Sequence, residues 1–169
     1  MSVVKTASKV MAVLAMTVIL NGTALSSIDA GSPAPDFALR SLAGKNLRLS
    51  EYRSEVVVLN FWSSWCRKCQ QAMPVLEDLY KQHGDNGLNV LAVGVEGLFD
   101  KSSEMAGELG LEFPVLIDER QEVSRLYDLN KLPLTLVIDR AGNVRYTHEG
   151  FGGDSGAEIA AEVAELLAE

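Results

Sequence analysis

FWSSWCRKC, residues 61–69, contains both cysteines of the 169-residue chain, Cys66 and Cys69. It follows an apolar, β-branched run at residues 56–62, which predicts a buried strand, and it precedes apolar residues at helical spacing. A thiol at such a strand-to-helix junction lies near the positive end of the helix dipole, which favours the reactive thiolate. The second thiol, one helical turn further on, can attack a mixed disulfide formed by the first. The arrangement indicates reversible dithiol–disulfide chemistry.

Arg67 and Lys68 separate the two cysteines. Two positive charges beside the sulfur lower the pKa of the Cys66 thiol by favouring its thiolate. Basic residues in the first turn of a helix oppose its dipole, so they cost helix stability unless they serve another purpose. We therefore interpret them as functional; a merely solvated helix start is the alternative.

The first 26 residues have the pattern of a secretory signal peptide. Lys5 and Lys9 precede an eleven-residue apolar run at residues 10–20, and small polar residues follow, with candidate cleavage sites after Ala24 and Ser26. The run is short for a membrane span, which needs about 20 apolar residues, although an uncleaved anchor remains the alternative. We expect residues 1–26 to export the protein to the periplasm and, where they are not cleaved, to anchor it in the membrane. We expect residues 27–169 to form one domain.

Composition narrows the classes of partner. Lys5, Lys9 and Asp29 precede Gly31, so the chain from Gly31 onward carries 13 Lys+Arg and 22 Asp+Glu, a net charge of −9. Such an acidic domain is a poor candidate for binding nucleic acid or an anionic membrane. In an oxidising compartment two cysteines usually form a structural disulfide, but this pair would close a very small loop that constrains the unfolded chain little.

Hydrophobic periodicity and turn residues predict an α/β fold. The predicted strands are residues 47–49, 55–62, 88–95, 115–117, 134–138 and 144–148, and the predicted helices are residues 66–83, 102–109, 119–127 and 155–167. A proline-containing leader at residues 31–39 enters the domain. Parallel strands with helical crossovers, followed by a hairpin and a last helix, predict a three-layer α/β/α sandwich with a mixed central sheet.

The order of these elements and five local motifs resemble the thioredoxin-fold family. The motifs are GSPAPDFAL at residues 31–39, FWSSWCRKC, Pro74 after the second cysteine, Leu132-Pro133 before the strand LTLVI, and DRAGNVRY at residues 139–146. Within that family the chain is most similar to exported thiol–disulfide oxidoreductases of the TlpA/ResA type, in the AhpC/TSA-like superfamily. The resemblance covers nearly all of the chain after the export segment.

The resemblance implies roles for particular residues. Cys66 would be the partly exposed nucleophile and Cys69 the buried resolving thiol. Pro133 would follow a cis peptide bond, face the thiols and keep metal ions away from them. The backbone of Leu132 would pair with an extended substrate segment, and Trp65, with Arg67 and Lys68, would belong to the substrate-binding surface.

Three other positions bear on this comparison. Relatives carry an acidic residue near Glu96 that relays a proton to the buried thiol; an ordinary loop carboxylate is the alternative for this chain. Ala72 stands where relatives often have a glutamate. Lys131 stands where a small or neutral residue commonly precedes the X-Pro pair.

These observations predict a monomeric periplasmic enzyme that reduces protein disulfides, as in cytochrome c maturation, with no cofactor beyond its own redox-active disulfide. A reductant in an oxidising compartment needs a membrane thiol–disulfide electron donor. One alternative is a thiol peroxidase, but the residues ahead of Cys66 lack the Pro and Thr of a peroxide site. Another is a carrier of Cu(I) or zinc with Cys66 and Cys69 as soft ligands, to which the chain adds only His83 and His148.

Overall fold

A seven-stranded mixed sheet organises the computed structural model, which describes residues 28–169. Its strands, in chain order, are β1 (Ala38–Ser41), β2 (Asn46–Arg48), β3 (Val56–Trp62), β4 (Leu88–Gly94), β5 (Val115–Ile117), β6 (Leu134–Ile138) and β7 (Val144–Glu149). Across the sheet the order is β2-β1-β5-β4-β3-β6-β7. β3, β4 and β5 are parallel, whereas β6–β7 on one side and β1–β2 on the other run antiparallel to their neighbours.

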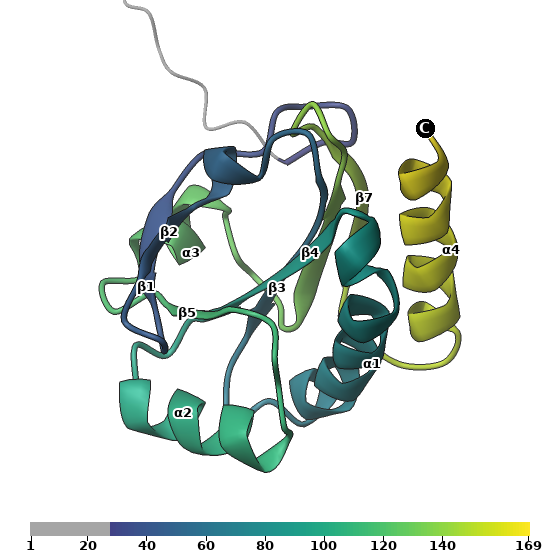
Figure 1. The fold of residues 1–169 in the computed structure, drawn as a ribbon. Coiled ribbons are helices and arrows are strands. Elements are labelled where there is room, and N and C mark those ends of the chain that lie inside the picture. Colours follow the sequence, from purple (N-terminus) through teal and green to yellow (C-terminus); the bar gives the residue numbers. More distant parts are fainter. Residues whose placement is uncertain (1–27) are drawn as a thin grey trace, which may run out of the picture.

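Helices cover both faces of this sheet (Figure 1). They are α1 (Arg67–His83), α2 (Phe99–Glu108), α3 (Glu122–Leu126) and α4 (Ser155–Ala168), with short 3-10 helices at Leu49–Tyr52 and Gly84–Asn86. α1, α2 and α4 pack on one face, and α3 with the first 3-10 helix packs on the other. The predicted α/β/α sandwich is confirmed.

The central strand β3 is buried along its whole length because it supplies side chains to both apolar layers. Val56, Val58 and Trp62 belong to the layer beneath α1 and α4. Val57 and Phe61 belong to the layer beneath α3. Each such side chain contributes about 1.5–3 kcal/mol when fully buried. The strand that leads into residues 63–69 is therefore held firmly from both sides.

A buried polar pair links this strand to its antiparallel neighbour. Asn60 of β3 and Thr135 of β6 are directly opposite in the strand register. The Asn60 side-chain amide donates a hydrogen bond of 2.8 Å to the Thr135 hydroxyl, and both residues are buried. Because an unpaired amide in this core would be costly, the pair favours this one register of β3 against β6.

The leader differs from the expectation in one respect. Its last two residues begin β1, Ala38–Ser41, which pairs with β2 and with β5, so the sheet has one strand more than predicted. Only Ser41 of this strand is buried, and the strand therefore lacks the apolar alternation by which strands are found.

Two helix starts also differ. α2 begins at Phe99, three residues before the prediction; that side chain is 41% exposed, so no buried apolar residue marks the first turn. α3 begins at Glu122, three residues later than predicted, because Gln121 has a left-handed backbone with φ of 54°. The Asp118 carboxylate then accepts hydrogen bonds from the N–H groups of Val123 and Ser124.

The predicted export segment, residues 1–26, lies outside the described residues, as does the start of the predicted domain at residue 27. Between residues 28 and 169 no helix has both the length and the apolar character needed to cross a bilayer.

Candidate active site

Cys66 occupies the N-cap position of α1, where its sulfur serves as the capping group. Its backbone is extended, and its Sγ accepts a hydrogen bond of 3.2 Å from the N–H of Cys69. The two residues form a disulfide, with their Cα atoms 5.2 Å apart. A negative charge on this sulfur would meet the unpaired N–H groups and the positive dipole end of a 17-residue helix. The local fold therefore favours the thiolate form of Cys66.

The two sulfurs differ in their access to solvent. Cys66 is 8% exposed and lines a cavity of about 560 Å³, whereas Cys69 is completely buried. Met73 and Leu76, also in α1, belong to the same apolar cluster as Cys69. A reaction partner in the cavity therefore reaches Cys66 before Cys69.

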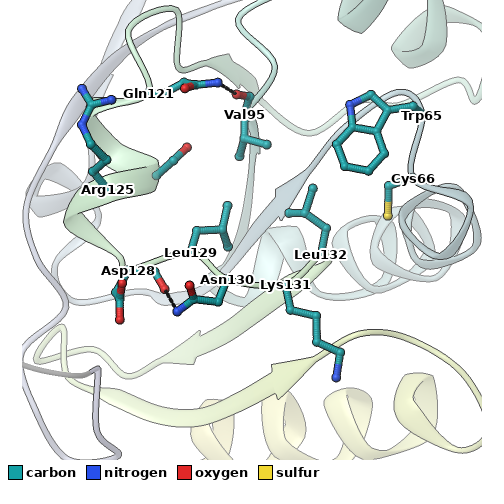
Figure 2. A pocket seen from close by; sticks show the side chains of 11 residues that line it. Trp65, Cys66, Val95, Gln121, Arg125, Asp128, Leu129, Asn130, Lys131 and Leu132 are labelled. Atoms are coloured by element: carbon teal, nitrogen blue, oxygen red, sulfur yellow. Dashed lines mark hydrogen bonds between the residues drawn. The ribbon is translucent and has the colours of Figure 1, made fainter.

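The loop before β6 forms another side of this cavity. The Leu132–Pro133 peptide bond is cis, and the Pro133 carbonyl accepts a hydrogen bond of 2.7 Å from the N–H of Gly150. Leu132 and Lys131 line the cavity together with Cys66 (Figure 2). Residues separated by more than sixty positions in the chain thus meet because β3 and β6 are neighbours in the sheet.

The two tryptophans near Cys66 lie in opposite environments. Trp62, the last residue of β3, is completely buried. Trp65 is 73% exposed, and its ring stands at the rim of the cavity beside Cys66 (Figure 2). A large aromatic surface left in water at this point gives the site an apolar contact surface.

Glu96 interacts with the loop that precedes Cys66 rather than with the sulfurs. Its two carboxylate oxygens accept hydrogen bonds from the Ser64 N–H, at 3.0 Å, and from the Ser64 hydroxyl, at 2.9 Å. The Ser64 carbonyl accepts a third hydrogen bond, from the Gln70 side chain at 2.8 Å. The proton relay predicted for Glu96 stays a prediction, and the geometry identifies Glu96 as a residue that positions this loop.

Positive charge gathers around Cys66. Arg67 and Lys68 are exposed, and neither forms an ion pair with any of residues 28–169. The Lys131 ammonium has a carboxylate of Glu149 at 3.9 Å, and both side chains are more than half exposed. At the other position that departs from relatives, Ala72 is buried within α1.

The far wall of the cavity comes from residues that the sequence analysis did not identify. They lie in and around α3 and in the segment before Lys131: Gln121, Ser124, Arg125, Asp128, Leu129 and Asn130. Their proximity in the chain to Leu132-Pro133 was an available signal. Their orientation depends on the short α3, which begins three residues later than the sequence pattern predicts.

The two histidines weighed as additional ligands of a metal carrier lie apart from the cysteines. His83 ends α1, and His148 of β7 hydrogen-bonds to Glu162 of α4 at 2.7 Å. In the described part of the chain no three His, Cys, Asp or Glu side chains are grouped to hold a metal ion.

Comparison with known proteins gives consistent matches. The chain matches the AhpC/TSA family over residues 30–147. The thiol-disulfide oxidoreductase ResA of Geobacillus kaustophilus is 39% identical over 123 residues, which cover 73% of this chain and 71% of that protein. ResA of Bacillus subtilis is 35% identical over 118 residues, covering 70% and 66%. A solved structure of a candidate thiol:disulfide interchange protein DsbE from Chlorobium tepidum has a TM-score of 0.79 and 31% identity, covering 83% of this chain and 99% of that one.

Proposed function

The chain belongs to the AhpC/TSA family and, within it, to the ResA-type thiol–disulfide oxidoreductases, and on that premise we propose that it reduces disulfides of proteins outside the cytoplasm. The observation that carries the proposal is the difference in access between the two sulfurs: Cys66 lines the cavity, whereas Cys69 is completely buried behind it. Cys66 can therefore react with a substrate disulfide, whereas Cys69 can react only with the mixed disulfide that Cys66 has formed.

In the reduced enzyme the Cys66 thiolate attacks one sulfur of a substrate disulfide. A mixed disulfide forms, and the other substrate sulfur leaves as a thiolate that takes up a proton. Deprotonated Cys69 then attacks the Cys66 sulfur, which releases the second substrate thiol and leaves the Cys66–Cys69 disulfide. Two electrons pass from the enzyme to the substrate, and the disulfide in the structure corresponds to the oxidised enzyme.

The backbone beside Pro133 is the proposed binding site for the substrate chain. Among the described residues, the N–H and carbonyl groups of Leu132 form no hydrogen bond with other backbone groups. An extended segment could add to them as a short strand and bring its disulfide to Cys66, while Trp65 supplies apolar contact. Pro133 would keep this loop in place and hinder metal binding at the thiols.

The proposed setting is the periplasm. Residues 1–26 would export the protein and either be cleaved or anchor it, and a membrane thiol–disulfide donor would re-reduce it. Cytochrome c maturation, in which cysteines of the apoprotein must be kept reduced, is the process that suits this activity. The protein would act there as a monomer, without a cofactor other than its own disulfide.

A trapping experiment tests the assigned order of the cysteines. A Cys69→Ser variant lacks the resolving thiol, so it should accumulate mixed disulfides with a disulfide-containing protein substrate through Cys66. A Cys66→Ser variant is the matched control and should trap none. Trapping through Cys69 in that control, with none in the Cys69→Ser variant, would reverse the assignment.

A further inference from the structure

Two ammonium groups converge at one point beside the active site. Lys68 comes from the first turn of α1, and Lys131 comes from the loop before Pro133. The side-chain nitrogen of each lies 4.0 Å from the position that a Cβ on Gly150 would occupy. The two charges are therefore separated by no more than twice that distance. We call Lys68 and Lys131 the lysine pair.

Gly150 keeps the space between these charges open. Its φ of +85° is a conformation that residues with side chains rarely adopt, and its N–H is held by the Pro133 carbonyl. The backbone at this point is thus fixed to the same loop that carries Lys131. Like charges held this close repel each other, and an anion that contacts both relieves the repulsion.

The chain itself neutralises this cluster poorly. Its nearby acid is Glu149, which reaches Lys131 only at 3.9 Å and from an exposed position. Lys68 and its neighbour Arg67 form no ion pair with any of residues 28–169. The surplus of positive charge at this site stands against a net charge of −8 for the whole chain.

The position of the lysine pair indicates that the anion belongs to the substrate chain. Lys131 is the residue before Leu132, whose backbone is the proposed binding site for an extended segment, and Lys68 is two residues after Cys66. Successive residues of an extended chain advance by about 3.3 Å. When the substrate cysteine lies at Cys66, a substrate side chain one or two residues away from it can therefore reach the lysine pair. In a polypeptide the anionic side chains are those of Asp and Glu.

We propose that the lysine pair recognises an aspartate or glutamate close to the substrate cysteine, so that the enzyme prefers disulfides in acidic extended segments. The inference rests on the proposed function and specifies its substrate class. Exposed charge pairs are individually weak, so we expect a preference of roughly 3- to 10-fold in the rate constant over a neutral segment.

The test measures the second-order rate constant with which the reduced full-length protein reacts with three peptide disulfides. The peptides are identical except for aspartate, asparagine or lysine on both sides of the cysteine. Because the Cys66 thiolate fraction affects all three equally, the ratio of aspartate to asparagine rates isolates substrate recognition. We expect a ratio of roughly 3 to 10 at low salt, a ratio near one at 1 M salt, and the lowest rate for the lysine peptide.

Single-residue variants test whether the lysine pair causes this ratio of aspartate to asparagine rates. Lys68→Gln and Lys131→Gln should each lower it toward one, Glu149→Gln should raise it, and Lys45→Gln, at an exposed site in the β1–β2 turn, should leave it unchanged. Equal rates for the three peptides, or a ratio insensitive to both pair variants, would overturn this inference alone. An absence of reaction with every peptide would overturn the proposed oxidoreductase function, and this inference with it.

Discussion

Glu96 holds Ser64 through both oxygens of its carboxylate, one on the backbone N–H and one on the hydroxyl. Ser64 lies two residues before Cys66, and Glu96 comes from the loop that follows β4. The carboxylate therefore ties the end of one parallel strand to the turn that carries Cys66, the proposed nucleophile, at the end of its neighbour. This places Glu96 beside the active-site loop as a positioning residue.

The first prediction separates positioning from proton relay. Glu96→Ala removes both hydrogen bonds, and hydrogen bonds to a charged group contribute about 1.5–3 kcal/mol each. The variant should therefore unfold at a lower urea concentration and reduce peptide disulfides more slowly at every pH. Glu96→Gln can still accept from the Ser64 N–H and donate to its hydroxyl, so it should retain most of the rate. If Glu96 instead relays a proton to Cys69, the Gln variant would lose resolution of the mixed disulfide as severely as the Ala variant.

The second prediction concerns the buried pair between β3 and β6. Thr135→Val preserves shape but leaves the Asn60 amide without its partner in the core, which should lower the free energy of unfolding by about 1–3 kcal/mol. Urea denaturation of the oxidised protein measures this cost. Thr147→Val, at an exposed position of β7, is the control and should change it far less. Equal costs for the two variants would mean that the hydrogen bond contributes nothing.

The third prediction concerns the charges between the cysteines. Arg67 and Lys68 have no acidic partner in the described chain, so their field acts on Cys66 without compensation. Replacing both by Gln should raise the pKa of the Cys66 thiol in the reduced protein, because two positive charges that favour the thiolate are lost. Thiolate absorbance of the reduced protein against pH gives the value. A Cys66 pKa that is unchanged, or lower, would show that these residues do not favour the thiolate.

The fourth prediction uses Tyr127, which fixes the leader to the domain. Its hydroxyl donates a hydrogen bond of 2.6 Å to the Pro35 carbonyl, and its ring contacts Phe37 and Phe61. Burial raises the pKa of Tyr127 far above its ordinary value of 10.0. Because the folded-state pKa is the higher one, the contribution to stability is fully present below pH 10 and is lost as the pH rises above it.

Tyr127→Phe should therefore cost about 1 kcal/mol at pH 7 through the lost hydrogen bond. It should also weaken the fall in stability between pH 9 and pH 11, since the ring can no longer ionise on unfolding. Urea unfolding at both pH values measures the two effects. A variant whose stability falls as steeply with pH as that of the unchanged protein would refute the assignment.

Local patterns were enough to predict the elements that carry the chemistry. The bounds of β5 and β6 are as predicted, and α1 begins one residue after the predicted start, because strong apolar runs and clear turn residues mark these segments. β1 escaped notice because its side chains are mostly exposed and it depends on β2 and β5 for its hydrogen bonds. Tertiary pairing, rather than local preference, makes it a strand.

The same distinction applies to the candidate site. Local motifs, together with the family resemblance that they carry, predicted Cys66, Cys69 and the loop at Pro133 as candidate site residues. The contact of Glu96 with Ser64 and the approach of Lys68 to Lys131 could not be predicted from spacing. Both join segments that are distant in the sequence, and they depend on side-chain directions that only the folded sheet defines.

The reduction potential of the Cys66–Cys69 couple tests the central claim, that this site donates electrons to protein disulfides. The protein is equilibrated with dithiothreitol or glutathione buffers of graded potential, and its free thiols are alkylated and counted by mass spectrometry. Couples of this kind range from about −270 mV in a thioredoxin-like reductant to about −120 mV in the strongest periplasmic oxidants. We predict a value nearer to −270 mV. A value near −120 mV would show that the protein is an oxidant and would contradict the account.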